Sequence, residues 1–426
     1  MDVFVGIDLG STTTKAVVLD GDGHVIGRGI TNSRSNYDVA AHIVREEAFV
    51  RTRFTLVERE TGAAAVEELE RNFKLHQYLD QLDRLGEAMS MIAGGPKHAA
   101  HARELSARLE AIGSDMVARA RQHFARGASR RSDFFRDLAA ADFMQLAEAI
   151  AEPKGITFDV LCGVFDAAIL SVEAVPIEDA FNRHIDAALE GGRPVRPDTA
   201  DETSALRRAV EYARSVELRA RSTVGTGYGR QRLPFPKEQI RSEILCHGLG
   251  AHAMFPETRT VLDIGGQDTK AIQLDAEGLV TSFQMNDRCA AGCGRYLGYI
   301  ADEMNLAVHE LGPLAQQSRQ RVKINSTCTV FAGAELRERL SLGQKREDIV
   351  AGLHRAIVIR AMSLLARSGG VSDQFTFTGG VARNPAAVSA IEELVRENYG
   401  QRTLNISSDS IYTGALGAAL FARRAA

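Results

Sequence analysis

The chain has 426 residues, of which 45% are hydrophobic and 25% are charged, so it is long enough to bury the cores of two or three domains. Its formal net charge of −4 gives no electrostatic reason to expect a nucleic acid or an anionic membrane as a partner. It has no apolar run of about 18 residues, no signal-peptide pattern at its start and no disulfide-type spacing among its five cysteines, so we expect a protein of the reducing cytoplasm.

The first 30 residues have the pattern of an antiparallel meander of three strands. Short apolar runs at residues 3–7, 15–19 and 25–30 are separated by turns rich in Gly, Ser, Thr and Asp. The first turn follows Asp8, so a strand would deliver this carboxylate to a loop whose backbone N–H groups can approach an anion closely.

Between about residues 37 and 200 the composition changes to Ala, Glu and Arg, and the apolar spacing becomes helical. The clearest stripe steps by three or four residues and consists of Leu105, Leu109, Ile112, Met116, Ala120 and Phe124. Glycines at 94–95 and 127 divide the segment, so we expect a mostly helical insertion of several helices.

After residue 206, strands and helices alternate again. We expect strands at 222–227, 260–264, 269–274 and 375–378, a helix over 238–254 and a closing helix over 414–423. The strand–Asp–Gly turn–strand unit of the N-terminus recurs at 260–274, which indicates two similar lobes. The sequence therefore predicts a first lobe of residues 1–36 and 201–255, a helical insertion of residues 37–200, and a second lobe of residues 256–426.

The two strand–turn–strand hairpins are suited to clamp a polyphosphate. Asp8 and Asp263 would reach the mouth of one cleft, where both carboxylates could hold Mg²⁺ and its waters. A third glycine turn, Gly379–Gly380, could lie flat under an adenine. One such hairpin alone is more often an ordinary β-turn, but three sites in this order favour a nucleotide site. Neither a Walker A motif nor the dinucleotide fingerprint is present.

In this order, the three segments resemble motifs of the sugar kinase, actin and heat-shock chaperone superfamily. Residues 6–15 are similar to its first phosphate motif, residues 262–270 to its second, and residues 378–384 to its adenosine motif. The resemblance implies an α/β fold with two ribonuclease-H-like lobes, ATP in the cleft between them, and here a large helical insertion in the first lobe.

From this arrangement we expect catalytic and nucleotide-binding roles for particular side chains. Asp8 and Asp263 would organise the metal and the attacking water, and Glu243 and Gln267 are candidates for positioning that water. The residues expected to bind the nucleotide are Gly10, Ser11, Thr12, Thr13, Lys15, Gly265, Gly266, Gly379, Gly380 and Asn384.

Two cysteines lie in polar, loop-like segments that precede predicted helices. Cys289 comes before a helix expected over 294–305, and Cys328 before one over 332–340. The free N–H groups at a helix N-terminus stabilise a thiolate and an anionic cluster. A [4Fe–4S] cluster takes four thiolates, so two subunits that donate two each would complete it.

The other cysteines leave alternatives open. Cys162 and Cys246 have the contexts of small buried hydrophobic residues. Cys293 is either a packed residue or a third cluster ligand. Zinc competes as the metal, although no Cys/His pair follows at zinc-site spacing, and redox disulfide chemistry would leave the nucleotide site unexplained.

At the cysteine segments the resemblance becomes more specific. Residues 263–270, 285–292 and 325–332 resemble the ATP-dependent electron activators of the BadF/BadG/BcrA/BcrD type, and residues 226–230 and 242–247 also match their pattern. These activators serve 2-hydroxyacyl-CoA dehydratases and benzoyl-CoA reductases. The resemblance implies a [4Fe–4S] cluster bridging two activator subunits through Cys289, Cys328 and their counterparts.

The helical insertion makes the chain most similar to the larger activator-type subunit of class I benzoyl-CoA reductase. That resemblance implies a heterodimer with a homologous activator-type subunit, two further subunits that bind the aromatic thioester, and ferredoxin as the electron donor. The alternatives are a homodimeric activator of a 2-hydroxyacyl-CoA dehydratase, a small-molecule kinase with incidental cysteines, and a binding module of the chaperone type.

Overall fold

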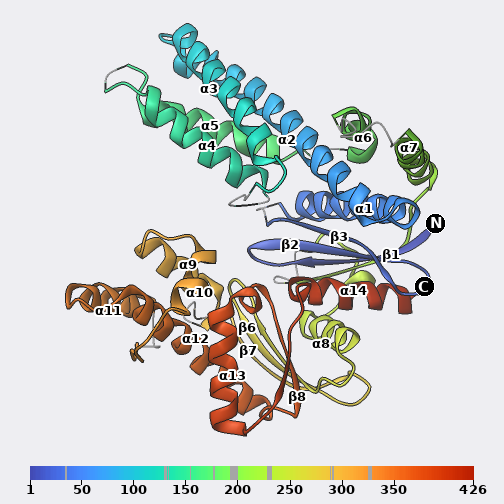
Figure 1. The fold of residues 1–426 in the computed structure, drawn as a ribbon, viewed down its shortest axis with the longest axis vertical. Helices are drawn as coiled ribbons and strands as arrows, with labels where there is room; N and C mark the ends of the chain where they lie inside the picture. The colour runs from blue at the N-terminus through green and yellow to red at the C-terminus, as the bar shows by residue number, and fades with distance from the viewer. Residues whose placement is uncertain are drawn as a thin grey trace. The chain divides into compact units, whose positions relative to one another are not determined.

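The computed structural model describes residues 1–33, 36–128, 132, 134–153, 155–175, 178–191, 200–227, 233–287, 289, 292–324 and 329–426. They form two compact units (Figure 1). One unit, the α/β unit, contains Asp2–Val44 and Arg219–Ala426, and the other, the helical unit, contains Arg45–Leu218 together with Met1.

The α/β unit begins with a four-stranded sheet in the order β3–β2–β1–β4 (Figure 1). β1 (Asp2–Leu9), β2 (Thr13–Leu19) and β3 (Val25–Asn32) form the predicted antiparallel meander, and β4 (Arg219–Gly227) pairs with β1 in parallel. Asp8 is the next-to-last residue of β1, where it stands opposite Lys15 on β2 and Thr226 on β4. The strand therefore ends with a carboxylate at the edge of the turn.

A second sheet has the order β7–β6–β5–β8–β9. β5 (Thr260–Ile264) and β6 (Thr269–Leu274) form the second predicted hairpin, and β8 (Gln374–Thr378) pairs with β5 in parallel. The two edge strands, β7 (Val280–Asn286) and β9 (Thr403–Asn405), were not predicted from the sequence. Two such sheets confirm the predicted α/β fold of two ribonuclease-H-like lobes.

Helix α8 (Glu243–Met254) packs against the cores of both sheets. On the second sheet, Val261, Ile272 and Leu274 form a cluster with residues of α8. On its other side α8 lies against α14 (Thr413–Arg424), where a Cβ on Gly250 would lie 3.0 Å from the backbone carbon of Thr413. Because small residues allow this close approach, α8 is fixed between elements of both lobes.

The opposite face of the second sheet packs on helices. Leu262, Ile264 and Ala271, which alternate along the strands with the residues that face α8, belong to a core shared with α12 (Arg346–Ser368). The remaining helices of this lobe are α9 (Gly294–Glu303), α10 (Val308–Ala315), α11 (Thr329–Ser341) and α13 (Pro385–Tyr399). By length and hydropathy α12 resembles a membrane span, but 67% of its apolar window is buried inside the unit, as expected of a core helix.

The helical unit contains the predicted insertion. Its helices are α1 (Tyr37–Thr61), which starts in the α/β unit, α2 (Ala63–Ala93), α3 (Ala102–His123), α4 (Phe135–Ile150), α5 (Phe158–Glu173), α6 (Ala180–Gly191) and α7 (Ala200–Ser215). Within this unit the long helices α2 and α3 lie side by side (Figure 1). The predicted stripe of α3 is buried in one core with residues of α2, α4 and α5, which confirms the helical pattern.

One predicted element is shorter than expected. The helix expected over 238–254 begins only at Glu243, because residues Lys237–Gln239 form a single 3₁₀ turn and Ile240 pairs as a β-bridge with Gly225. Ile240 has an extended backbone, and the N–H of Arg241 donates to the carbonyl of Gly225 at 3.0 Å, so this segment pairs with β4 and does not continue as a helix. The lobe and insertion boundaries at residues 36, 200 and 255 stay predictions.

Candidate functional site

The two phosphate-type turns lie next to each other. A Cβ on Gly266, in the second turn, would overlap Thr12 Oγ1 in the first, so the approach depends on glycine. The first turn is braced by Ser33, whose Oγ donates to the carbonyl of Gly10 and whose N–H donates to the carbonyl of Thr12 at 2.8 Å. Ser33 also bonds Thr14 Oγ1 at 3.1 Å. The structure thus brings Gly10, Thr12 and Gly266 together, as expected.

Lys15 provides a positive charge at the first turn. It lies opposite Asp8 in the strand pair, and a Cβ on Gly10 would lie 3.3 Å from its Nζ. Ser11 and Thr13 are half-buried in the same turn. An ammonium and several backbone N–H groups beside one glycine turn are the donors that a phosphate group requires.

Asp8 has an unsatisfied oxygen. Its side chain is buried, and Oδ1 has no hydrogen-bond partner among the residues that the structure describes. The other oxygen lies near His247 of α8, because a Cβ on Gly414 would lie 2.8 Å from both Asp8 Oδ2 and His247 Nε2. A buried carboxylate oxygen without a donor is a position that a cation or a water would satisfy.

A buried lysine on β6 joins three carboxylates. Lys270 Nζ lies 2.8 Å from Asp268 Oδ1, 2.9 Å from Glu243 Oε1 and 3.4 Å from Asp263 Oδ2. Burial alone would lower the pKa of Lys270, but Asp263, Glu243 and Asp268 raise it well above its usual value. The ammonium therefore stays charged and holds carboxylates from three separate segments in place.

Asp263 is held by further contacts. Its Oδ1 accepts a hydrogen bond from Thr378 Oγ1 at 2.8 Å and lies 3.4 Å from His247 Nδ1. Burial alone would raise the pKa of Asp263, but His247 and Lys270 hold it far below its usual range. Burial would lower the pKa of His247, yet the facing Asp263 carboxylate raises it. The carboxylate is therefore ionised whenever the protein is folded at neutral pH.

Three side chains at this site could together hold a cation. Asp8, Glu243 and His247 each offer a ligand atom, and these atoms lie within 4.8 Å of one another. Glu243 was expected at the site from the sequence, whereas His247 was missed. Its spacing of four residues from Glu243 places both on one face of α8, and this signal could have identified it. Gln267 is half-buried in the second turn.

The adenosine-type turn follows β8. Gly379 has φ 86°, and a Cβ there would lie 3.0 Å from Asp263 Oδ1, so glycine is required by both conformation and space. A Cβ on Gly380 would meet no atom within 4 Å, which leaves open space above this residue. The side chain of Asn384 caps α13, because Oδ1 accepts from the N–H of Ala386 at 3.0 Å. Its role beside a nucleoside stays a prediction.

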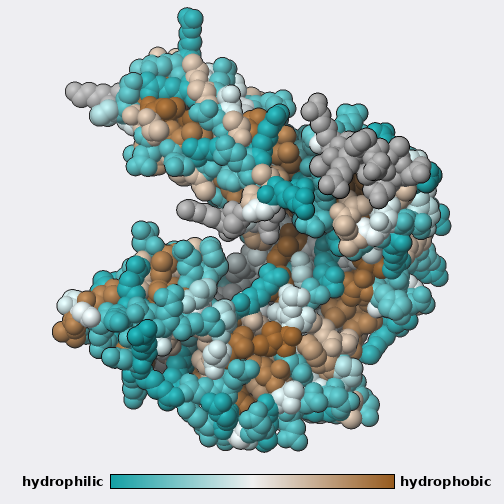
Figure 2. All heavy atoms as spheres, in the orientation of Figure 1, coloured by the Kyte–Doolittle hydropathy of each residue, from teal (hydrophilic) through white to brown (hydrophobic). Residues whose placement is uncertain are grey.

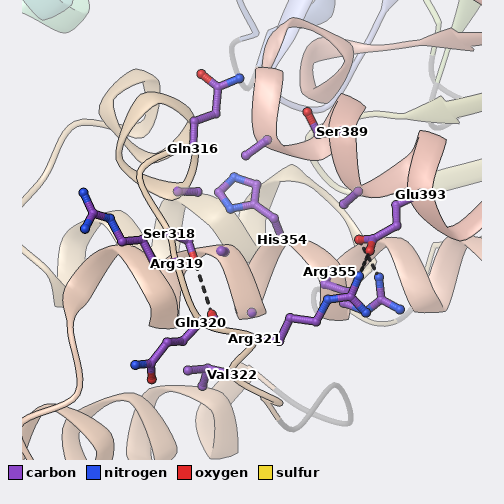
Figure 3. Close-up of a pocket in the computed structure, with 15 residues that line it drawn as sticks. Gln316, Ser318, Arg319, Gln320, Arg321, Val322, His354, Arg355, Ser389 and Glu393 are labelled. Carbon is purple, nitrogen blue, oxygen red and sulfur yellow. Dashed lines mark hydrogen bonds and ion pairs between the residues drawn. The ribbon is translucent and has the colours of Figure 1, made fainter.

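A cavity of about 530 Å³ lies near Asn384, between α12, α13 and the segment after α10 (Figure 3). His354 points into it, and its Nε2 lies 2.9 Å from Asn384 Nδ2. On another wall Arg355 pairs with Glu393 at 2.8 Å. None of the residues predicted to bind nucleotide or metal lines this cavity. The cavity adjoins the adenosine-type turn through the contact of its lining residue His354 with Asn384.

Of the two predicted cluster ligands, the structure describes Cys289. Its thiol is half-buried and accepts a hydrogen bond from Arg360 Nη1 at 3.0 Å, and its carbonyl accepts one from Asn286 Nδ2 at 3.1 Å. Cys328 lies outside the described residues, as do Tyr228, Gly229 and Arg230 of the 226–230 motif.

The remaining cysteines occupy packed positions. Cys246 is fully buried on α8, and burial raises the pKa of its thiol to about 12. Cys293 is also buried, at the N-cap of α9, and burial raises its pKa. Cys162 is half-buried on α5, where its thiol donates to Met144 Sδ at 3.3 Å. Cys293 is thus packed in the core at the start of α9, and its role as a third cluster ligand stays an open alternative.

The second phosphate-type turn is bonded directly to the Cys289 segment. The N–H of Gly294 donates to the carbonyl of Gly265 at 2.8 Å, and the N–H of Arg295 donates to that of Gly266 at 2.7 Å. Thr269 Oγ1, on β6, donates to the carbonyl of Gly292. These hydrogen bonds join Gly292 and the start of α9 to the second hairpin.

The fold and the site define a nucleotide-binding protein of two similar lobes with a cysteine segment bonded to one phosphate turn. The chain belongs to the BadF/BadG/BcrA/BcrD ATPase family, whose model matches residues 5–422. This confirms the family that the sequence motifs indicated.

Individual relatives refine the comparison. The chain is 41% identical to the (R)-2-hydroxyglutaryl-CoA dehydratase activating ATPase of Acidaminococcus fermentans over 228 residues, which covers 54% of this chain and 85% of the relative. It is 33% identical to one of the benzoyl-CoA reductase subunits of Thauera aromatica over 175 residues, 41% of this chain and 62% of the relative. The crystal structure of a component of the A. fermentans (R)-2-hydroxyglutaryl-CoA dehydratase has the same fold, with a TM-score of 0.55, 23% identity and coverage of 100% and 99% of the two chains.

Proposed function

We propose that this protein is an ATP-hydrolysing activator that passes low-potential electrons to a 2-hydroxyacyl-CoA dehydratase type of partner. The observation that carries ATP-coupled electron transfer is the set of hydrogen bonds that join the second phosphate-type turn and Thr269 to the Cys289 segment: the carbonyls of Gly265 and Gly266 accept, and Thr269 Oγ1 donates. The choice of partner rests on identity, which is 41% to a dehydratase activator and 33% to a benzoyl-CoA reductase subunit. The expected benzoyl-CoA reductase role therefore becomes the second candidate.

The nucleotide would bind at the two turns. Lys15 and the backbone N–H groups of Gly10 to Thr13 would hold phosphate oxygens, and Gly379–Gly380 would border the nucleoside. The buried carboxylates around the unsatisfied Asp8 oxygen fit Mg²⁺, which would neutralise charge on the phosphates. Asp8 would orient the water that attacks the γ-phosphorus, while the bond to the ADP oxygen breaks and ADP and phosphate leave. Lys270 keeps Asp263 and Glu243 fixed during this step.

The Cys289 segment fits a [4Fe–4S] cluster in its chemistry. A half-buried thiol that accepts a bond from a guanidinium is able to carry the negative charge of a thiolate ligand. With Cys328 as the second ligand, one chain would supply two of four thiolates, so a second activator-type subunit would supply the others. When bound, the cluster would accept and release one electron at low potential.

Two exposed apolar side chains of the α/β unit support a subunit interface. Phe331 on α11 is 62% exposed, and Ile359, next to Arg360 on α12, is 44% exposed. Figure 2 shows hydrophobic residues on the surface over the α11 end of the α/β unit. Large exposed apolar side chains that follow Cys328 and precede Arg360 in the sequence are consistent with a partner that covers them.

The helical unit is the feature that supports the second candidate, a role with benzoyl-CoA reductase. The aligned segments cover 85% of the dehydratase activator but 54% of this chain, so much of this chain lies outside the sequence alignment. The insertion was the feature that resembled a benzoyl-CoA reductase subunit. We therefore propose a homodimer or a heterodimer with a homologous subunit, a ferredoxin-type donor and a cytoplasmic location, with the acyl-CoA substrate on separate catalytic subunits.

Anaerobic purification of three variants tests the proposal. The wild-type protein should contain iron and acid-labile sulfide and hydrolyse ATP. Asp8→Asn should lose ATP hydrolysis and keep the iron, whereas Cys289→Ala should lose the iron and keep hydrolysis. Cys162→Ala is the matched control and should keep both. Iron retained in Cys289→Ala would contradict the ligand assignment.

A second assay separates the partner classes. The protein is mixed with a reductant, ATP and either a 2-hydroxyacyl-CoA dehydratase or the substrate-binding subunits of a benzoyl-CoA reductase. Dehydration of a 2-hydroxyacyl-CoA supports the main proposal, ring reduction supports the second candidate, and phosphate transfer to a small acceptor without iron would support a kinase instead.

A further inference from the structure

Arg360 is the charged residue in contact with the Cys289 thiol. It lies 71 residues later in the chain, on α12, and its Nη1 donates to Cys289 Sγ at 3.0 Å. Helix α12 is anchored in the core of the lobe by neighbours on both sides of Arg360, including Val358 and Ala361, which are 0% and 1% exposed. The guanidinium therefore comes from a fixed helix and not from a loop.

The cysteine segment is packed on the arginine stem. A Cβ on Gly292 would lie 3.8 Å from Arg360 Cδ and 2.9 Å from Asn286 Nδ2. Asn286 in turn bonds the carbonyl of Cys289. The loop therefore contacts Arg360 through the thiol, and the space between Gly292 and the arginine stem is about that of one methyl group.

A cation bonded to a ligand sulfur acts differently on the two oxidation states of a cluster. One-electron reduction adds negative charge to the cluster and its sulfurs and transfers no proton. A charge-assisted hydrogen bond to a sulfur therefore stabilises the reduced state more than the oxidised state and raises the reduction potential. Removing the cation should make the cluster harder to reduce.

We propose that Arg360 is a positioning residue that sets the reduction potential of the cluster held by Cys289. This inference rests on the proposed function, because it requires the cluster. It assigns to α12 a task that the ATP site does not have, namely to make the cluster reducible by its low-potential donor before nucleotide acts. The competing explanation is that Arg360 only packs the loop.

Three variants of the full-length protein, purified anaerobically with their cluster, distinguish these explanations. Arg360→Gln removes the charge, and Arg360→Lys keeps it. Arg367→Gln is the matched control, because Arg367 lies on the same helix about 10 Å farther along and is exposed. The cluster is titrated with titanium(III) citrate and followed by electron paramagnetic resonance, with no partner protein and no nucleotide present.

At a fixed solution potential we expect the ratio of reduced to oxidised cluster to fall about tenfold in Arg360→Gln. This corresponds to a reduction potential lowered by about 59 mV for a one-electron couple. Arg360→Lys should shift less, and Arg367→Gln should match the wild type. An unshifted Arg360→Gln with full iron content would refute the inference and leave the proposed function standing. A wild-type protein without iron and sulfide would refute the proposed function and this inference together.

Loss of the cluster also gives an answer. If Arg360→Gln loses iron and Arg360→Lys keeps it, a positive charge is required at the thiol. The reduction potential of the cluster is then measured on the Arg360→Lys variant. If both lose iron while their ATP hydrolysis equals that of the wild type, Arg360 retains the cluster and does not tune it, which overturns the inference.

Discussion

Replacing Lys270 by Met should destabilise the α/β unit strongly at neutral pH. The substitution keeps a long apolar side chain but removes the ammonium that lies 2.8 to 3.4 Å from Asp268, Glu243 and Asp263. Removing one partner from a buried charge pair costs about 3–5 kcal/mol, because the remaining charge is left in a poorly solvated place. Three carboxylates share this cation, so we expect the upper part of that range.

The cost should depend on pH in a defined direction. The cations beside Asp263 hold its folded pKa far below its unfolded value of about 3.9, so they contribute stability that is present above that value and is lost as the pH falls through the folded pKa. The gap between Lys270→Met and wild type should therefore be largest near pH 7 and should narrow below about pH 4, where the unfolded carboxyls are protonated.

Hydrogen exchange is the suitable assay, because the chain contains no tryptophan to report unfolding by fluorescence. The opening free energy of the amides of β5 and β6 is measured at neutral pH and at about pH 3, below the unfolded pKa of Asp. Lys345→Met, at an exposed lysine that precedes α12, is the control and should change stability by less than about 0.5 kcal/mol. A cost below about 1 kcal/mol for Lys270→Met, or a gap that stays constant with pH, would refute this reasoning.

Three further substitutions test other contacts. Thr269→Val keeps the side-chain volume but removes the hydroxyl that donates to Gly292, which should cost about 1–3 kcal/mol. The rate of ATP-dependent electron delivery should fall more than the rate of ATP hydrolysis, and Thr269→Ser should restore electron delivery. Equal losses in both rates would contradict the coupling. Gly414→Ala would place a methyl group 2.8 Å from Asp8 Oδ2 and His247 Nε2, so kcat for ATP should fall about tenfold or more, whereas Gly298→Ala, with no atom within 4 Å, should have wild-type kcat. Asp348→Asn should increase hydrogen exchange at residues 318–320, because the Gln320 N–H, the Ser318 hydroxyl and the Arg319 N–H donate to the carboxylate and hold the pKa of Asp348 low. The difference in exchange between variant and wild type should shrink as the pH falls below about 4. A difference that does not change with pH would argue against a role of the carboxylate charge.

The sequence predicted those parts of the site that depend on local turn chemistry. Asp8 and Asp263 follow apolar runs and precede glycine turns, so their placement could be predicted from strand and turn patterns alone. Lys270 also had a signal, since it is a charged residue directly before the apolar pair Ala271 and Ile272 of a predicted strand, and a charged residue that is buried must have partners.

Other parts could not be predicted because they depend on contacts between distant segments. Arg360 meets Cys289 only through the packing of α12, and nothing near either residue in the sequence indicates the other. The edge strands β7 and β9 were missed for a different reason. β7 is only partly buried along its length and β9 has three residues, so neither has the apolar alternation that identifies a strand.

Helix α12 connects three contacts along one rod. Asp348 bonds the segment after α10, His354 bonds Asn384 beside the adenosine-type turn, and Arg360 bonds the Cys289 thiol. Consecutive members of this series are six residues apart, about 9 Å along a helix axis. Inserting one residue between His354 and Arg360 would rotate the guanidinium by about 100° about that axis and so detach it from the sulfur. The length of this stretch of helix is therefore as constrained as the identities of the residues that it carries.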